Sequence, residues 1–315
     1  MIVKDSRPGY RPYLASVRRV RPLSPHFVRV TFTADDFATF GTDGLDQRIK
    51  LLFPLDGIGF GDIGLEDPDA IAAGDWYARW RDLPDAERNP IRTYTVRSVR
   101  PAEREIDVDL VRHEHHDGTA GPASRWLAQA SVGDTLVIVG PDARSLDSAG
   151  GIDWHPGTAS VVLLAGDETA VPAICAVLES LPPQTTAHAI IEVPDAGDRL
   201  PIDAHDGCAV TWLARGDAPV GTELEPAVRA WVGANRAVYR SALTASAQAL
   251  EDVDVDSGLL WDSFGAPMNG DFYAWLAGEA SVIKRLRRFL VTETGIHRRS
   301  VAFMGYWRLG RAEAN

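Results

Sequence analysis

The sequence predicts two successive domains, an all-β antiparallel barrel followed by an α/β domain with a parallel sheet. The 315 residues, 45% of them hydrophobic, are enough for two buried cores. In the first half apolar and polar residues alternate, as in HFVRVTFT at 26–33, which is the period of a strand with one buried face. In the second half a continuous apolar run leads into apolar residues at helical spacing, as at 159–182, which is typical of α/β domains.

Short strands broken by Gly and Pro indicate a barrel or sandwich for the first domain. The predicted strands are 26–33, 49–54, 91–99, 105–112 and 135–141. One short helix is expected at 121–130, in GPASRWLAQA. The stretch 55–90, which contains Trp76, Tyr77 and Trp80, is expected to be a surface excursion between two strands.

The predicted domain boundary lies within 140–158, where Gly, Pro, Ser and Asp are dense and no period is sustained. We therefore assign residues 1–148 to the first domain and 149–315 to the second. The elements predicted for the second domain are strands at 186–193, 208–215 and 300–307, helices at 222–232 and 236–250, and strand-turn-helix units at 159–182 and 271–295.

The composition excludes several classes of protein. With 44 acidic and 32 basic residues the formal charge is -12, which disfavours nucleic acid and anionic membranes as partners. Cys175 and Cys208 are too few for a disulfide framework or an iron-sulfur cluster. Neither a signal peptide nor an apolar run of membrane-spanning length is apparent, so we expect a soluble, cytoplasmic protein.

The stretch RTYTVR at 92–97 has an unusual composition for a strand, with two arginines around a Tyr-Thr pair. A guanidinium suits a pyrophosphate, a phenol ring can cover an aromatic ring, and a threonine hydroxyl can bond a ring nitrogen. The alternative is an edge strand with solvated arginines. The sequence GPAS at 121–124 begins the predicted helix, where free N–H groups and the helix dipole would bind a phosphate, unless it is a helix start without a ligand.

These motifs, in this order, resemble the siderophore-interacting protein family, which are flavin-dependent ferric-siderophore reductases with the two-domain architecture of the ferredoxin-NADP reductases. The resemblance covers nearly the whole chain. It is carried by DQRIKLLFP, RTYTVR, GPASRWLAQASVGDTLVIVGP, LLAGDETAVPAI, AWLAGEASVIKRLRRFL and GYWRLGRAE.

The resemblance implies a role for each motif residue in binding FAD. Arg92 would bind the pyrophosphate, Tyr94 would pack on the flavin, Thr95 would contact its N5 edge and Arg97 would support the phosphate side. The remaining residues would lie along the cofactor or cap its phosphates, namely His113, Gly121, Pro122, Ala123 and Ser124. The residues expected to border the flavin-nicotinamide junction are Asp167, Glu168, Thr169, Glu279 and Trp307, although acids at a helix start also serve as caps and Trp307, like Tyr306, could be core packing.

An acidic protein that binds anionic ferric siderophores needs a locally basic pocket. Lys50 is the predicted substrate-steering residue, because its strand leads toward the flavin in the family pattern. Arg48, Lys284 and Arg308 are further candidates, with a solvated cation as the alternative for each. The histidines of VRHEHHDG, at 111–118, lack a third well-spaced ligand, so no metal site is predicted.

The chemistry that the resemblance implies is hydride transfer from NADPH or NADH to the flavin, followed by one-electron reduction of Fe(III) in a siderophore. Ferredoxin stays open as an alternative electron donor. Two alternative functions also stay open: a general NAD(P)H-dependent flavin electron-transfer reductase that serves a protein partner, or a non-catalytic flavin- or siderophore-binding module. Arg215 is a candidate for choosing between NADPH and NADH. The siderophore class and the oligomeric state are not predicted.

Overall fold

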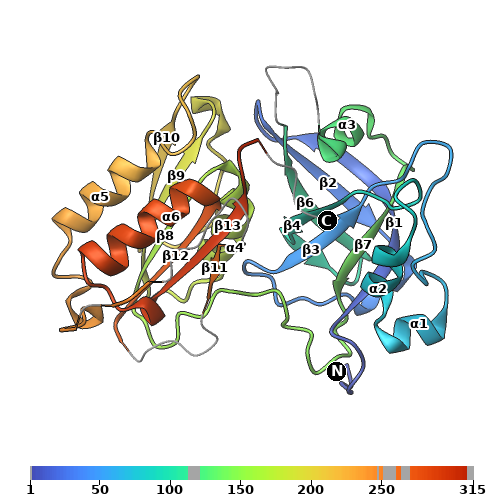
Figure 1. Ribbon diagram of the computed structural model, residues 1–315, viewed down its shortest axis with the longest axis horizontal. Helices are drawn as coiled ribbons and strands as arrows, with labels where there is room; N and C mark the ends of the chain where they lie inside the picture. Colours follow the sequence, from blue (N-terminus) through green and yellow to red (C-terminus); the bar gives the residue numbers. More distant parts are fainter. Residues whose placement is uncertain (1, 113–120, 247, 251–259, 264–269, 311–315) are drawn as a thin grey trace. The chain divides into compact units, whose positions relative to one another are not determined.

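The computed structural model describes residues 2–112, 121–246, 248–250, 260–263 and 270–310 (Figure 1). His113, His115 and His116 therefore lie outside the described residues. The chain forms two compact units, which divide between Ile152 and Asp153.

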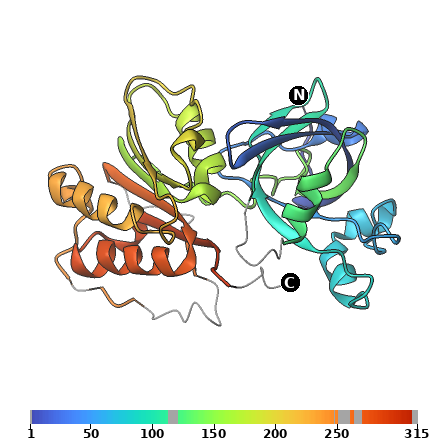
Figure 2. The same ribbon diagram turned by 90° about the horizontal axis from the view of Figure 1, so that it is seen from above.

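The first unit is built on a seven-stranded antiparallel sheet in the order β4-β3-β7-β1-β2-β6-β5. The strands at the two ends of this order are consecutive in the chain, because only Val96 and Arg97 separate β4 from β5. The sheet therefore curls back toward itself (Figure 2). Its strands are β1 (Tyr10–Pro22), β2 (Phe27–Thr33), β3 (Arg48–Leu52), β4 (Ile91–Thr95), β5 (Ser98–Arg100), β6 (Glu105–Val111) and β7 (Thr135–Pro141).

Strand β1 was not predicted, and its two prolines explain why. Pro12 lies in the part of β1 that pairs with β7, whereas β2 pairs only from Ser16 onward. At Pro12, therefore, β1 has a neighbouring strand on one side only. A proline, which lacks an N–H, is tolerated in a strand where no neighbour requires that donor. The predicted strand at 91–99 is two strands, β4 and β5, broken at Val96 and Arg97.

The first unit also contains helices, so the prediction of an all-β domain holds only for its sheet. The stretch 55–90 folds into α1 (Pro68–Ala73) and α2 (Trp76–Asp82). Trp80 of α2 is buried, and its indole N–H donates to the Asn89 carbonyl at 2.9 Å. Helix α3 (Pro122–Gln129) and a 3-10 turn (Asp35–Thr39) complete the unit.

The second unit is an α/β fold around a six-stranded sheet in the order β10-β9-β8-β12-β13-β11. Five strands are parallel, but the short edge strand β11 runs antiparallel to β13, so the sheet is mixed and not purely parallel as predicted. The strands are β8 (Val161–Gly166), β9 (Thr186–Val193), β10 (Cys208–Ala214), β11 (Trp261–Asp262), β12 (Phe272–Glu279) and β13 (Val301–Trp307).

Helices cover both faces of this sheet. Helices α5 (Leu224–Ala234) and α6 (Ala280–Arg288) share one buried cluster with the sheet, and α4 (Val171–Ser180) lies on the opposite face (Figures 1 and 2). The continuous apolar strands follow from this cover, because both faces of each central strand are buried. In the described residues no helix is long and apolar enough to span a membrane.

The predicted helix at 236–250 is wrong for the residues that the structure describes. Only a 3-10 turn, Arg240–Ala242, forms there. The Thr244 hydroxyl accepts from the Ser246 N–H at 3.2 Å and donates to the Ser246 carbonyl at 3.4 Å, which offers the backbone an alternative to a helix.

The strand order places β8 at a topological switch point. The chain leaves β8 toward β9 and β10 on one side, and returns to β12 and β13 on the other. In open α/β sheets ligands bind at the carboxyl ends of the strands where this reversal occurs. The ends of β8 and β12 are therefore the expected ligand edge of the second unit.

Candidate functional site

The first group of predicted site residues lies on the β3–β4 pair. Lys50 of β3 is opposite Thr93 of β4, and the Lys50 Nζ donates to the Thr93 Oγ1 at 2.6 Å. This bond fixes the ammonium over one face of β4. The half-buried environment of both side chains leaves part of that face accessible.

Arg92 and Tyr94 lie on the other face of β4, opposite Leu51 and Ile49, which belong to the buried hydrophobic cluster of the first unit, called here the interior cluster. Tyr94 packs against that cluster. The Arg92 Nη1 donates to the Ile91 carbonyl at 2.6 Å, and no carboxylate of the described residues forms an ion pair with Arg92. Its positive charge is therefore not neutralised within the described part of the unit.

Thr95 ends β4 and is 5% exposed. It pairs with Arg48 on β3, and the following residue, Val96, donates its N–H to the Gln47 carbonyl at 2.9 Å. The main chain at the end of β4 is thus fixed from β3. The contact between Thr95 and a flavin stays a prediction.

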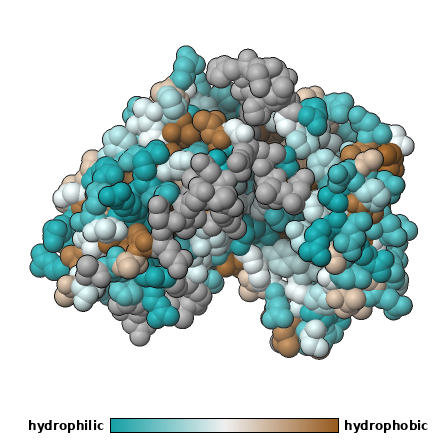
Figure 3. Space-filling view, in the orientation of Figure 1, coloured by the Kyte–Doolittle hydropathy of each residue, from teal (hydrophilic) through white to brown (hydrophobic). Residues whose placement is uncertain are grey.

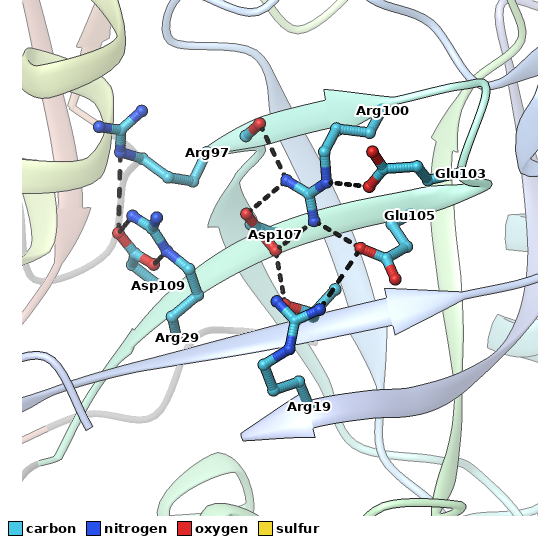
Figure 4. A network of polar contacts seen from close by, with 10 residues as sticks. Arg19, Arg29, Arg97, Arg100, Glu103, Glu105, Asp107 and Asp109 are labelled. Carbon is cyan, nitrogen blue, oxygen red and sulfur yellow. Dashed lines mark hydrogen bonds and ion pairs between the residues drawn. The ribbon is translucent and has the colours of Figure 1, made fainter. Parts of the chain in front are cut away.

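Arg97 differs from Arg92 because it faces a carboxylate. Its Nε lies 3.7 Å from Oδ2 of Asp109, whose side chain is fully buried and also binds both Nε and Nη2 of Arg29, at 2.7 and 2.8 Å (Figure 4). Sequence reasoning assigned Arg97 to the phosphate side of the cofactor. The structure adds that this guanidinium is already paired through β6.

Asp109 belongs to a row of three buried acids on β6, with Glu105 and Asp107. Arginines from neighbouring strands neutralise the row, and Arg100 binds Asp107 through two nitrogens, at 2.7 and 2.9 Å (Figure 4). The alternation EIDVDLV predicted which residues share this face, but a single strand pattern could not reveal the arginines opposite them.

Helix α3 begins with an open N-terminus. Gly121 is its N-cap, and no side chain of the described residues caps its first turn. A Cβ added at Gly121 would meet no atom of the described residues within 4 Å. The helix start is half-buried, and Ala123 packs against the same interior cluster as Tyr94. Free N–H groups, a helix dipole and open space are what a phosphate requires.

The second group of predicted residues meets at the switch point of the second unit. Asp167 follows β8, and each of its two carboxylate oxygens accepts two hydrogen bonds. Oδ1 accepts from the Thr169 N–H at 2.9 Å and the Thr169 hydroxyl at 2.5 Å. Oδ2 accepts from the Glu279 N–H at 2.7 Å and the Trp307 indole N–H at 2.8 Å. Asp167 thus ties β8 to the ends of β12 and β13.

Glycine is required beside this carboxylate. Gly278 of β12 has a φ of +150°, and a Cβ built there would lie 2.6 Å from the Asp167 Oδ2. The AGE motif at 277–279 therefore serves the close approach of Asp167, as well as supplying Glu279.

Burial, followed by repulsion from Glu168, raises the pKa of Asp167 from its usual 3.8 to about 7. Glu168 is 1% exposed and is bound through both oxygens by Arg215, at 2.6 and 2.7 Å. Arg215 also lies 3.6 Å from Glu192. The cation considered for nucleotide choice is therefore engaged by two carboxylates.

Sequence reasoning missed Glu192, which is fully buried near the end of β9. Its two oxygens accept backbone N–H groups of Gly221, Glu223 and Leu224 at 2.7 to 2.9 Å and so cap α5. A lone acid in the apolar strand TAHAIIEV was the available signal. Glu279 likewise caps α6 through the Val282 N–H at 3.0 Å. Side chains of this unit thus occupy the positions that a phosphate could take at these two helix starts.

The remaining candidates have mixed roles. Tyr306 stacks on Trp261, with ring centroids 5.8 Å apart, and so packs within the second unit. On α6, Arg285 pairs with Glu225 at 2.8 Å and Arg287 pairs with Asp262 at 2.9 Å. The structure places Lys284 on the same helix and Arg308 directly after β13, both half-buried.

Comparison with family models gives two matches, one for most of each unit. Residues 16–145 match the siderophore-interacting FAD-binding domain, and residues 159–310 match the siderophore-interacting protein model.

Relatives align along nearly the whole chain. An uncharacterised protein of Mycobacterium tuberculosis, Rv2895c, is 37% identical over 298 residues, which is 93% of this chain and 89% of that protein. The ferric vibriobactin reductase ViuB of Vibrio cholerae is 27% identical over 305 residues, 96% of this chain and 91% of that protein.

Solved structures agree. A siderophore utilization protein from T. fusca has a TM-score of 0.67 at 27% identity, covering 98% of this chain and 97% of its own. The siderophore-interacting protein SipS from Aeromonas hydrophila has a TM-score of 0.64 at 26% identity, covering 97% of this chain and 94% of its own. The ferredoxin reductase of carbazole 1,9a-dioxygenase, at 14% identity and a TM-score of 0.55 over 95% of this chain and 70% of its own, shares the two-domain fold. This chain belongs to the siderophore-interacting protein family.

Proposed function

We propose that this protein is an FAD-containing reductase that takes electrons from NADPH or NADH and reduces Fe(III) in a ferric siderophore. Residues 1–148 would hold FAD and residues 149–315 would hold the nicotinamide nucleotide. Family membership and the similarity to ViuB, a ferric vibriobactin reductase, support the reaction. Because NADPH and NADH are cytoplasmic reductants, we propose that it takes place in the cytoplasm.

The observation that carries the proposal is the pair of cationic features in the first unit. Helix α3 begins without a side-chain cap among the described residues, and Arg92 has no acidic partner among them. A doubly charged pyrophosphate would satisfy both, through backbone N–H groups and a bidentate guanidinium. The residues present therefore fit FAD. Tyr94 would cover its ring and Thr95 would contact its N5 edge.

The bound flavin would convert a two-electron donor into single-electron steps. One NADPH or NADH would reduce two ferric ions and release one proton. Fe(II) is held less tightly than Fe(III) by hard oxygen ligands, so the metal would leave the siderophore. The protein has to position its ligands, and Lys50 would attract an anionic ferric siderophore.

The absorption spectrum of the purified protein tests the proposal. We expect a flavin spectrum that bleaches when NADPH or NADH is added without oxygen, and that returns when a ferric siderophore follows. A ferrous-specific dye should then report Fe(II). A protein that binds no FAD, or whose flavin is reduced by neither nucleotide, would contradict the proposal.

A further inference from the structure

Thr169 is the exposed point of an otherwise buried stretch. From Val162 to Cys175 every residue is buried except Thr169, which is half-buried. It lies in the turn after β8, at the switch point of the sheet. A ligand that approaches the end of β8 would therefore meet this side chain before any other of the stretch.

The Thr169 hydroxyl has a defined hydrogen-bonding direction. It donates its single proton to the Asp167 Oδ1 at 2.5 Å, so its oxygen can only accept from a ligand. Asp167 cannot turn away, because its Oδ2 is held by the Glu279 N–H and the Trp307 indole. The strands β12 and β13 thereby fix the orientation of a side chain on β8.

We infer that Asp167 orients Thr169 so that its oxygen accepts a hydrogen bond from the carboxamide NH2 of the nicotinamide ring. This inference rests on the proposed function, which brings a nicotinamide nucleotide to this edge. A carboxamide carries N–H donors, whereas the carboxylate of a nicotinic acid nucleotide carries only acceptors. Thr169 would therefore select the amide, since two acceptors cannot pair.

The selection should depend on pH. Asp167 faces Glu168 on its own turn, the Glu279 N–H from β12 and the Trp307 indole from β13, and Arg215 neutralises Glu168 from the end of β10. Burial and Glu168 raise the pKa of Asp167 to about 7. A proton on Oδ1 would be donated to the Thr169 oxygen, and the Thr169 proton would turn outward. The Thr169 hydroxyl would then donate a hydrogen bond to the ligand, so a carboxylate could bind there as the acceptor.

Isothermal titration of the FAD-loaded, oxidised protein with NAD⁺ and with nicotinic acid adenine dinucleotide tests this without turnover. At pH 8 we expect NAD⁺ to bind about tenfold more tightly or better, and the ratio to fall toward one at pH 5.5. Thr169→Val should give a ratio near one at both pH values, and Thr169→Ser should keep the wild-type ratio. Thr211→Val, exposed on β10, is the matched control.

Asp167→Asn adds an independent arm. The asparagine amide would donate to the Thr169 oxygen, so the preference for the amide should be lost at both pH values. Circular dichroism and flavin absorbance check folding, and if Thr169→Val fails to fold, the wild-type pH profile and the serine variant still decide.

A wild-type ratio in Thr169→Val, or equal affinities in the wild type at pH 8, would overturn the inference. Flavin reduction by NADH and NADPH is measured in parallel. If NADH or NADPH reduces the flavin but Thr169→Val keeps the wild-type ratio of affinities for NAD⁺ and nicotinic acid adenine dinucleotide, the role of Thr169 is refuted and the proposed function stands. Absence of both reduction and dinucleotide binding refutes both.

Discussion

Arg92 is the residue on which cofactor binding depends most directly. Its guanidinium has no carboxylate partner among the described residues, so its charge is available to a pyrophosphate. A charge-assisted hydrogen bond contributes about 1.5 to 3 kcal/mol, and we expect Arg92→Ala to weaken FAD binding by about 10- to 100-fold. The flavin-to-protein absorbance ratio after gel filtration measures it. Arg18→Ala, exposed on β1, is the control, and normal occupancy in Arg92→Ala would refute the role.

Lys50 should affect the substrate and not the cofactor. We expect Lys50→Ala to raise KM for an anionic ferric siderophore by about tenfold, since one charge-assisted contact is lost. The rate of flavin reduction by NADH or NADPH should stay unchanged in stopped-flow measurements. Lys284→Ala on α6, the other lysine considered for the basic pocket, should raise this KM less than Lys50→Ala does. Equal losses in both steps would indicate a folding defect and would count against substrate steering.

Asp167 should make stability depend on pH in a direction opposite to most acids. Its folded pKa of about 7 exceeds the usual 3.8, so between these values the native state keeps a proton that the unfolded state has released. The free energy of unfolding should therefore fall as pH rises from 5 to 7, by about 1 kcal/mol per pH unit. Urea titrations of the wild type and Asp167→Asn isolate this contribution. Equal pH slopes in the two proteins would show that Asp167 does not carry it.

At the level of elements, the acids on β6 couple neighbouring strands of the first sheet. Asp107 is buried, binds Arg100 through both oxygens and accepts from the Thr31 hydroxyl at 2.7 Å. Asp107→Ala would leave the buried Thr31 hydroxyl without this acceptor and Arg100 with Glu105 and Glu103 as its remaining carboxylates, so the variant should lose about 2 to 3 kcal/mol of unfolding free energy. Arg100→Ala combined with it should lose less than the sum of the two single losses.

The exposed pair Arg104–Asp35, at 2.9 Å, is the matched control for this comparison. Solvent screens such a pair, so Arg104→Ala should change the urea midpoint much less than Asp107→Ala. Similar midpoints for the two variants would mean that the β6 acids do not stabilise the sheet.

The elements also show what a sequence can and cannot predict. Regular periods identified the continuous strand β8 and the helix α6, because a buried face repeats along the chain. The predicted helix at 236–250 is wrong where the Thr244 hydroxyl bonds the local backbone. Strand β1 was missed because it contains Pro12, which is tolerated there since the two halves of β1 pair with different strands. Both outcomes depend on partners that a local pattern does not contain.

The candidate site divides in the same way. The motif around Arg92 identified the strand, and GDETA identified the switch-point turn. The partners of Arg97 and Arg215 come from distant strands, so the sequence could not show that Asp109 and Glu168 already bind these cations. Glu192 was missed because its role depends on the main chain before α5.

For the whole molecule, the net charge of -12 should oppose the approach of an anionic substrate. The face seen in Figure 3 is largely hydrophilic, with apolar areas scattered over it. At about 10 mM salt the Debye length is roughly 30 Å, so repulsion from the whole chain acts on an approaching anion and outweighs attraction by a single lysine, whereas at about 150 mM salt the length falls to roughly 8 Å and this repulsion is screened. We therefore expect kcat/KM for a ferric catecholate to rise several-fold between about 10 and 150 mM salt.

A neutral ferric trihydroxamate is the matched substrate for this experiment, because repulsion should not slow its approach at low salt. Initial rates of Fe(II) formation with saturating NADH or NADPH give kcat/KM for both substrates. If the rate with the catecholate instead falls as salt is added, local attraction at Lys50 outweighs the charge of the molecule, and the Lys50→Ala variant should then lose that salt dependence. If kcat/KM for the catecholate rises with salt more steeply in Lys50→Ala than in the wild type, the repulsion comes from the whole chain and the opposing attraction comes from Lys50.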